Sequence, residues 1–78
     1  MEWDGRDNPL RKTLGRNVRA RRLELEMTQE ALAQDCELDS TYVSAIERGL
    51  RNPSVDVIAK LAVGLRVPAW VLMRPKQS

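Results

Sequence analysis

The stretch "DSTYVSAIERG", residues 39–49, places short hydrogen-bonding side chains along one face of an expected helix. At about 100° per residue, Ser40, Ser44 and Arg48 line up on this outer face, and Thr41 lies beside them. Hydroxyl groups donate to or accept from base edges, a threonine methyl contacts thymine, and a guanidinium binds guanine or phosphate. These residue types would suit contact with double-stranded DNA, but composition alone favours an ordinary amphipathic helix with a polar exterior.

The other side chains of this segment must pack against the rest of the chain. Val43, Ile46 and Glu47 point away from the outer face. Ala45 lies beside the outer residues, and Tyr42 lies at the border. Because the outer side chains are short, this face is thin enough to enter a groove about 12 Å wide.

A long first helix is expected at the start of the chain. Asn8 followed by Pro9 indicates its beginning, because asparagine caps a helix and proline loses no needed hydrogen bond there. The helix reaches to about Glu26, and its apolar positions share one face with Arg22. These apolar positions are Leu10, Leu14, Val18 and Leu25.

A second helix follows and leads directly into the segment at residues 39–49. It begins after the cap Thr28, with Met27 and Leu32 at the spacing of a hydrophobic staple, and it ends near Cys36. Asp39 then caps the next helix after a very short turn. The order of helix, tight turn and helix indicates helix-turn-helix geometry.

Two more helices are expected after Gly49, which closes the third helix. Ser54 caps the fourth helix, and Pro68 opens a short fifth helix, "PAWVLM", that Pro75 stops. The buried stripe of the fourth helix is expected at Val55, Ile58, Leu61, Ala62 and Leu65.

Length and composition limit the class of protein. The 78 residues suffice for one domain, expected at residues 9–74 between tails at 1–8 and 75–78. There is no apolar run of membrane-spanning length, no pattern of a secretory signal, and a single cysteine, Cys36, expected as a small buried residue. We therefore expect a cytoplasmic protein without a membrane partner. Histidine is absent, so we expect no enzyme, metal or cofactor.

Charge is distributed unevenly along the chain. Seven basic residues and one acid lie between residues 6 and 22, whereas seven of the eleven acids lie between residues 24 and 47. The basic end would suit a phosphate-binding surface, and it would equally suit a solvated helix face.

Three motifs together resemble those of the Cro/repressor (XRE-like) family of phage and bacterial regulators. They are "TQEALA", "YVSAIERG" and "RNPS", and the resemblance covers about residues 10–73. It implies an all-α fold, a compact five-helix, lambda-repressor-like DNA-binding domain with its third helix in the major groove.

The resemblance assigns phosphate contacts outside the third helix. The residue matching Gln29 binds phosphate and braces the recognition helix, although Gln29 would also serve as a polar residue of a first helical turn. Arg51 and Asn52 match a loop that grips phosphates, and Asn52 would equally serve as a turn residue before Pro53.

Within the third helix, the resemblance places three residues at base edges. They are Ser40, Thr41 and Ser44, while Tyr42 matches a position that meets the DNA backbone or a methyl group. Some controller proteins of restriction–modification systems, one branch of the family, carry arginine at the position of Ser40.

The resemblance also implies a structural ion pair. Arg22 and Glu47 match residues that form a partly buried pair, which would fix the recognition helix against the first helix. This chain departs from the family pattern at three other positions near helix ends, where the family often has glycine. They are Glu26, Glu37 and Arg66.

The segment "AWVLM" has more apolar surface than one helix face can bury. Trp70 and Val71 are therefore expected at a two-fold dimer interface. The sequence thus predicts a homodimeric regulator of a near-palindromic DNA operator, with no evident small-molecule ligand. The alternative is an antitoxin-type module that binds a partner protein.

Overall fold

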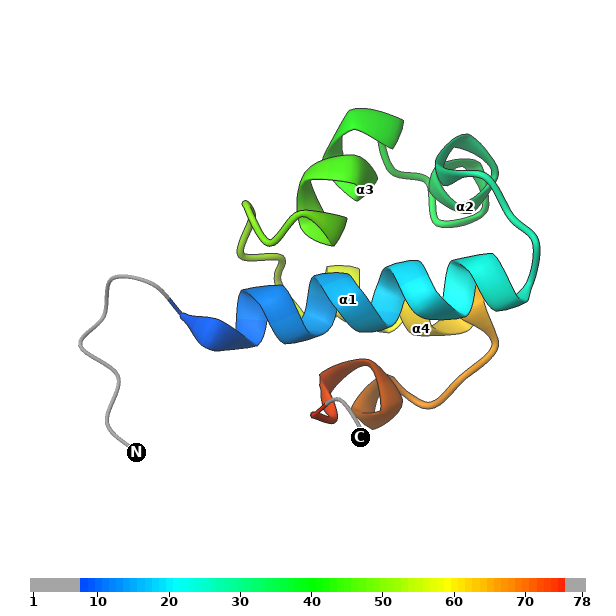
Figure 1. Ribbon diagram of the computed structural model, residues 1–78. Helices are drawn as coiled ribbons and strands as arrows, with labels where there is room; N and C mark the ends of the chain where they lie inside the picture. The colour runs from blue at the N-terminus through cyan, green and yellow to red at the C-terminus, as the bar shows by residue number, and fades with distance from the viewer. Residues whose placement is uncertain (1–7, 76–78) are drawn as a thin grey trace.

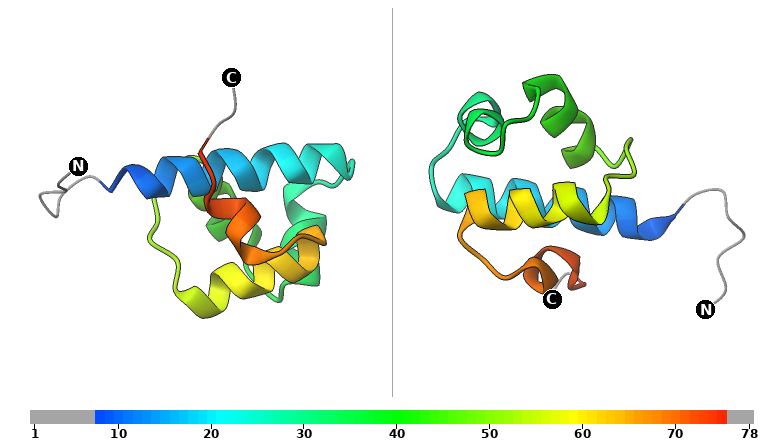
Figure 2. Two further views of the ribbon diagram at one scale, coloured as in Figure 1. Left: turned by 90° about the horizontal axis from the view of Figure 1, so that it is seen from below. Right: turned by 180° about the vertical axis from the view of Figure 1, so that it is seen from behind.

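The structure, a computed structural model, describes residues 8–75. This part of the chain contains four α-helices, one 3-10 helix and no strand. The elements are α1 (Pro9–Glu24), α2 (Gln29–Asp35), α3 (Ser40–Glu47), α4 (Val55–Leu65) and η1 (Ala69–Met73). Figure 1 shows α1 through the middle, with α2 and α3 on one side and η1 on the other. In the left view of Figure 2, η1 lies between α1 and α4, and it contacts both helices.

The all-α prediction is confirmed, but the fifth helix takes a different form from the one expected. η1 is a 3-10 helix of five residues, so the structure has four α-helices. Pro68 precedes η1 without a side-chain cap, and Pro75 follows soon after it. A segment this short between two prolines cannot build the repeated hydrogen bonds that stabilise an α-helix.

The four side-chain caps predicted from the sequence are confirmed. Each cap accepts a hydrogen bond from a backbone N–H of the first turn, at distances of 2.8 to 3.1 Å. The caps are Asn8 for α1, Thr28 for α2, Asp39 for α3 and Ser54 for α4. Local sequence therefore determines where every α-helix begins.

Three non-glycine residues adopt the left-handed backbone conformation near helix ends. Glu26, Glu37 and Arg66 have φ angles of 56°, 56° and 60°. These are the positions where the resembled family often has glycine, so the turn geometry is retained without the residue that favours it. Because Glu26 is left-handed, α1 ends at Glu24, before the end expected from its apolar pattern.

The core lies where α1, α2, α3, α4 and η1 face one another. It contains eleven buried apolar residues: Leu14, Val18, Leu32, Ala33, Cys36, Val43, Ile46, Leu61, Ala62, Leu65 and Leu72. The Sγ of Cys36 donates to the carbonyl oxygen of Lys60 on α4, and burial raises the pKa of this thiol. No helix between residues 8 and 75 has the length and apolarity of a membrane span.

Three expectations about burial were wrong. Val55 is 81% exposed, because it lies roughly a quarter turn around α4 from the direction shared by Leu61 and Leu65. Leu10, in the first turn of α1, is also exposed. Ala45 is buried, because α3 packs against both α1 and α2 and these two neighbours cover more of its surface than one would.

Candidate nucleic-acid interface

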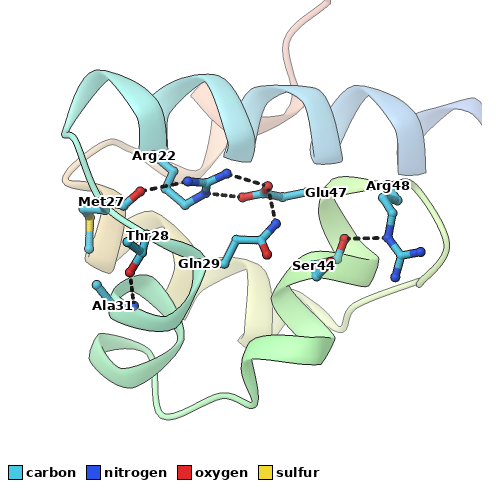
Figure 3. A network of polar contacts seen from close by, with 8 residues as sticks. All are labelled: Arg22, Met27, Thr28, Gln29, Ala31, Ser44, Glu47 and Arg48. Atoms are coloured by element: carbon cyan, nitrogen blue, oxygen red, sulfur yellow. Dashed lines mark hydrogen bonds and ion pairs between the residues drawn. The ribbon is translucent and has the colours of Figure 1, made fainter.

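A buried ion pair connects α1 to the end of α3. Arg22 Nε donates to Glu47 Oε2 at 2.7 Å, and Arg22 Nη2 donates to Glu47 Oε1 at 3.0 Å (Figure 3). A third donor, Nη1, reaches the carbonyl oxygen of Met27 at 2.8 Å. Arg22 is only 8% exposed, and its hydrogen bond to Glu47 raises its pKa despite the opposing effect of burial. The guanidinium therefore holds the α1–α2 connection, just before α2, and the end of α3 together.

Gln29, at the first position of α2, joins the same network. Its Nε2 donates to Glu47 Oε1 at 3.0 Å, so the carboxylate accepts from both α1 and α2 (Figure 3). An amide nitrogen has two N–H donors, which leaves one for a phosphate. The bracing contact implied by the resemblance is thus present, while the phosphate contact of Gln29 stays a prediction.

The backbones of α1 and α3 meet at Gly15, which sequence reasoning missed. A Cβ atom placed there would lie within 2.6 Å of the Glu47 carbonyl oxygen, and it would also collide with the Ile46 carbonyl oxygen. The signal in the sequence was a glycine inside a strong helical pattern, which often marks a packing requirement. Together with the ion pair, this contact fixes the distance between α1 and α3.

The start of α3 is fixed by its own cap. Both the backbone N–H and the hydroxyl of Thr41 donate to Asp39 Oδ1. These hydrogen bonds lower the pKa of Asp39, with the hydroxyl contributing most. The hydroxyl proton of Thr41 is therefore used inside the protein, although the residue itself is exposed.

The rest of the predicted base-reading face is accessible. Ser40, Tyr42 and Ser44 are partly exposed, and Arg48 at the C-cap of α3 is exposed. Arg48 Nε lies 3.4 Å from the Ser44 carbonyl oxygen, and Figure 3 shows its guanidinium directed away from Glu47. Arg48 is thus separate from the buried ion pair and available to an anion.

The loop after α3 presents the other predicted phosphate contacts. Arg51 and Asn52 are exposed, whereas Pro53 between this loop and α4 is buried. Gly49 has a φ of 77°, and a Cβ atom on it would lie 3.0 Å from Lys12 Cγ. The loop therefore begins against the first turns of α1, next to the basic N-terminal part of the chain.

The two residues predicted at a dimer interface lie on η1 and differ in exposure. Trp70 is 64% exposed, and Val71 is partly buried. The guanidinium of Arg74 lies 5.7 Å from the centroid of the Trp70 ring, within the range of a cation–π contact. Leu72, which lies between Trp70 and Arg74 in the sequence, is fully buried and attaches η1 to the core.

Known proteins share both the sequence and the geometry. The helix-turn-helix family profile matches residues 18–69. A hypothetical transcription factor of Neisseria meningitidis serogroup B is 42% identical over 92% of this chain and 68% of its own length. The control protein C.BamHI of Bacillus amyloliquefaciens is 48% identical over 77% of this chain and 75% of its own.

A solved structure also superimposes on the chain. It is the restriction–modification controller protein C.Esp1396I, a tetramer in complex with its natural 35 base-pair operator, with a TM-score of 0.77 and 37% identity. The match covers 83% of this chain and 86% of the other. This chain therefore belongs to the helix-turn-helix family of DNA-binding transcription regulators, and restriction–modification controller proteins are among its relatives.

Proposed function

We propose that the chain is a sequence-specific regulator that binds a near-palindromic operator as a homodimer in the cytoplasm and controls its own gene. A restriction–modification controller or a phage-type repressor works on this plan. The observation that carries the proposal is the network of Arg22, Gln29 and Glu47, which holds α3 from behind and leaves its hydroxyl face outward. A helix fixed in this way can enter the major groove without reorganisation.

Three hydroxyl-bearing side chains would read base edges, namely Ser40, Thr41 and Ser44, with Tyr42 touching the backbone or a thymine methyl. Phosphates would be bound on either side of them by Gln29, Arg48, Arg51 and Asn52. Single hydroxyls discriminate weakly between bases, so DNA shape and deformability would supply part of the specificity.

The occupant proposed for the exposed face of η1 is a second copy of this chain. A large exposed indole next to a cation is typical of interface anchors, and the related C.Esp1396I is a tetramer on its operator. Binding to two half-sites one turn of B-DNA apart would require the two α3 helices of such a dimer to lie about 34 Å apart.

Base reading is tested by comparing the loss of binding affinity that each protein variant shows across a panel of operator variants. Operators are first selected from random duplexes, and binding is then measured by mobility shift. Ser44→Ala is expected to weaken preference at one or two base pairs. Arg51→Ala should weaken binding to all variants alike and reduce the slope of log affinity against log salt by about one.

Thr41→Ala removes the methyl group and also the hydroxyl with its hydrogen bond to Asp39, whereas Thr41→Val removes the hydroxyl and keeps the methyl group. Comparing the two variants separates the contribution of the methyl group from that of the hydroxyl. Circular dichroism confirms that each variant is folded. Equal losses on every operator for Ser44→Ala, Thr41→Val and Arg51→Ala would contradict base reading by α3.

The homodimer is tested by Trp70→Glu, followed by sedimentation equilibrium. The substitution places a charge where the indole would be buried, and we expect dissociation to increase about thirtyfold or more, as for an interface hot spot. Val63→Glu is the control, because Val63 is exposed on α4 and outside the proposed interface. An unchanged dimer in Trp70→Glu would contradict the interface.

A further inference from the structure

Two side chains of α1 attach the C-terminal segment by its main chain. Asn17 Nδ2 donates to the carbonyl oxygen of Leu72 at 2.8 Å and to that of Arg74 at 2.7 Å. Arg21, one turn further along α1, donates from Nε to the carbonyl oxygen of Leu65 at 2.9 Å. One amide thus holds η1 at its end, and one guanidinium holds the end of α4 before it.

η1 packs against α1 and α4, with Leu72 buried and Met73 partly buried against the core. Its start has no side-chain cap, and Leu72 is the only fully buried side chain of the five residues in η1. Apolar packing is not directional, so it defines the rotation of so short a segment less closely than hydrogen bonds do. Both N–H groups of the Asn17 amide are used on carbonyls two residues apart, which fixes this rotation.

The rotation decides which surface a partner would meet. With Leu72 buried, Trp70 is exposed, and the hydrogen bond from Asn17 fixes the backbone of Arg74, whose guanidinium lies over the Trp70 ring. The indole and the cation are therefore already arranged before any partner arrives. Preorganised side chains lose less freedom on association.

We infer that Asn17 is a positioning residue for self-association, which sets the separation of the two recognition helices in the dimer. α1 holds α3 through Arg22 and η1 through Asn17, so this helix fixes the position of η1 relative to α3. In the proposed dimer, that position determines how far α3 lies from the two-fold axis. The inference rests on the proposed homodimer and adds the residue that controls its geometry.

The test uses Asn17→Leu, which has a similar size and no donor, and two measurements. Sedimentation equilibrium gives the dissociation constant of the dimer, and selection from random duplexes gives the half-site sequence and the separation of half-sites. We expect about tenfold weaker dimerisation, because the order of η1 must then be established on association. The selected half-site sequence should be unchanged, while its centre-to-centre separation should spread over several base pairs.

Two further variants separate positioning from simple loss of stability. Ile58→Val trims a side chain packed against the core and should lower the melting temperature without altering half-site separation. Asn17→Gln keeps both donors and should recover part of the fixed separation. If Asn17→Leu dimerises like the wild type and selects the same single separation, the inference is wrong. If the wild type itself selects no repeated half-site, the proposed homodimeric operator binding fails first.

Discussion

α3 and η1 are two short segments attached to opposite sides of α1, and they are attached by different chemistry (Figure 1). α3 is held by a buried pair of opposite charges, Arg22 and Glu47. η1 is held by its buried Leu72 and by Asn17, which donates to the carbonyls of Leu72 and Arg74, while Arg21 donates to the last carbonyl of α4 before η1. The first contact joins two side chains, and the second joins a side chain to a backbone.

The difference determines how much each attachment resists change. Loss of one member of a buried ion pair leaves an unpaired charge away from water, at a cost of about 3–5 kcal/mol. A carbonyl that loses its donor near the surface can be hydrated instead, so the net loss is about 1 kcal/mol. α3 is thus firmly fixed, whereas the orientation of the C-terminal segment is open to adjustment by single substitutions.

The largest effect is expected for Glu47→Ala on the α3 side. The free energy of unfolding should fall by about 3–5 kcal/mol, because Arg22 stays buried without its partner. Urea denaturation followed by circular dichroism measures this change. Glu24→Ala is the matched control, since Glu24 is an exposed acid 3.8 Å from Arg21 and should contribute less than about 1 kcal/mol. Similar losses in both variants would show that burial of the pair is unimportant.

A second large effect is expected for Gly15→Ala, which tests the close approach of α1 to α3. The added methyl group collides with backbone carbonyls that cannot rotate away, so we expect a net loss of about 1–3 kcal/mol despite the better helix propensity of alanine. Gly64→Ala is the control, because its Cβ would meet the side chains of Cys36 and Leu32, which have more freedom to shift. Thermal denaturation of the two variants should rank Gly15→Ala as the less stable.

On the η1 side, Arg21→Met should have a smaller effect. The aliphatic part of the side chain is kept, and only the hydrogen bond to the Leu65 carbonyl is lost, for about 1 kcal/mol. Arg19→Met, at an exposed position of α1, should change the free energy of unfolding by less than about 0.5 kcal/mol. A loss in Arg21→Met as large as that in Glu47→Ala would remove the distinction between the two attachments.

The smallest effect is a gain, expected for Glu37→Gly in the turn between α2 and α3. Glycine adopts the left-handed conformation without strain, so stability should rise by about 0.5–1 kcal/mol after allowance for its more flexible unfolded state. Glu37→Ala removes the same charge and keeps the strain, so its unfolding midpoint in urea should stay near that of the wild type. Equal gains in both variants would attribute the effect to charge instead.

The sequence predicted features that depend on neighbours along the chain. Helix starts followed from the caps at Asn8, Thr28, Asp39 and Ser54, because a cap bonds within its own first turn. Helix periodicity likewise predicted most of the core, whose buried residues recur at three- and four-residue spacing.

Features that depend on distant parts of the chain were less accessible. The exposure of Val55 and the burial of Ala45 follow from which helices lie alongside, and a single helix pattern does not contain this information. Gly15 contacts Glu47, which lies more than thirty positions further along the chain. Asn17 contacts Leu72, which lies fifty-five positions further along. A glycine inside a helical pattern signals close packing without naming the partner, and the type of Asn17 gives no signal of its contact.

Cys36 gives the molecule an internal probe of local opening. Its thiol is enclosed between α2 and α4, bonded to the Lys60 carbonyl, and less readily ionised than an exposed cysteine. An alkylating reagent attacks the thiolate, so burial and the raised pKa of Cys36 slow the reaction, and widening of the pocket that Cys36 lines between α2 and α4 would speed it. The rate of alkylation therefore reports how often α2 moves away from α4. If DNA binding makes the α2–α3 unit more rigid, it should slow the alkylation of Cys36.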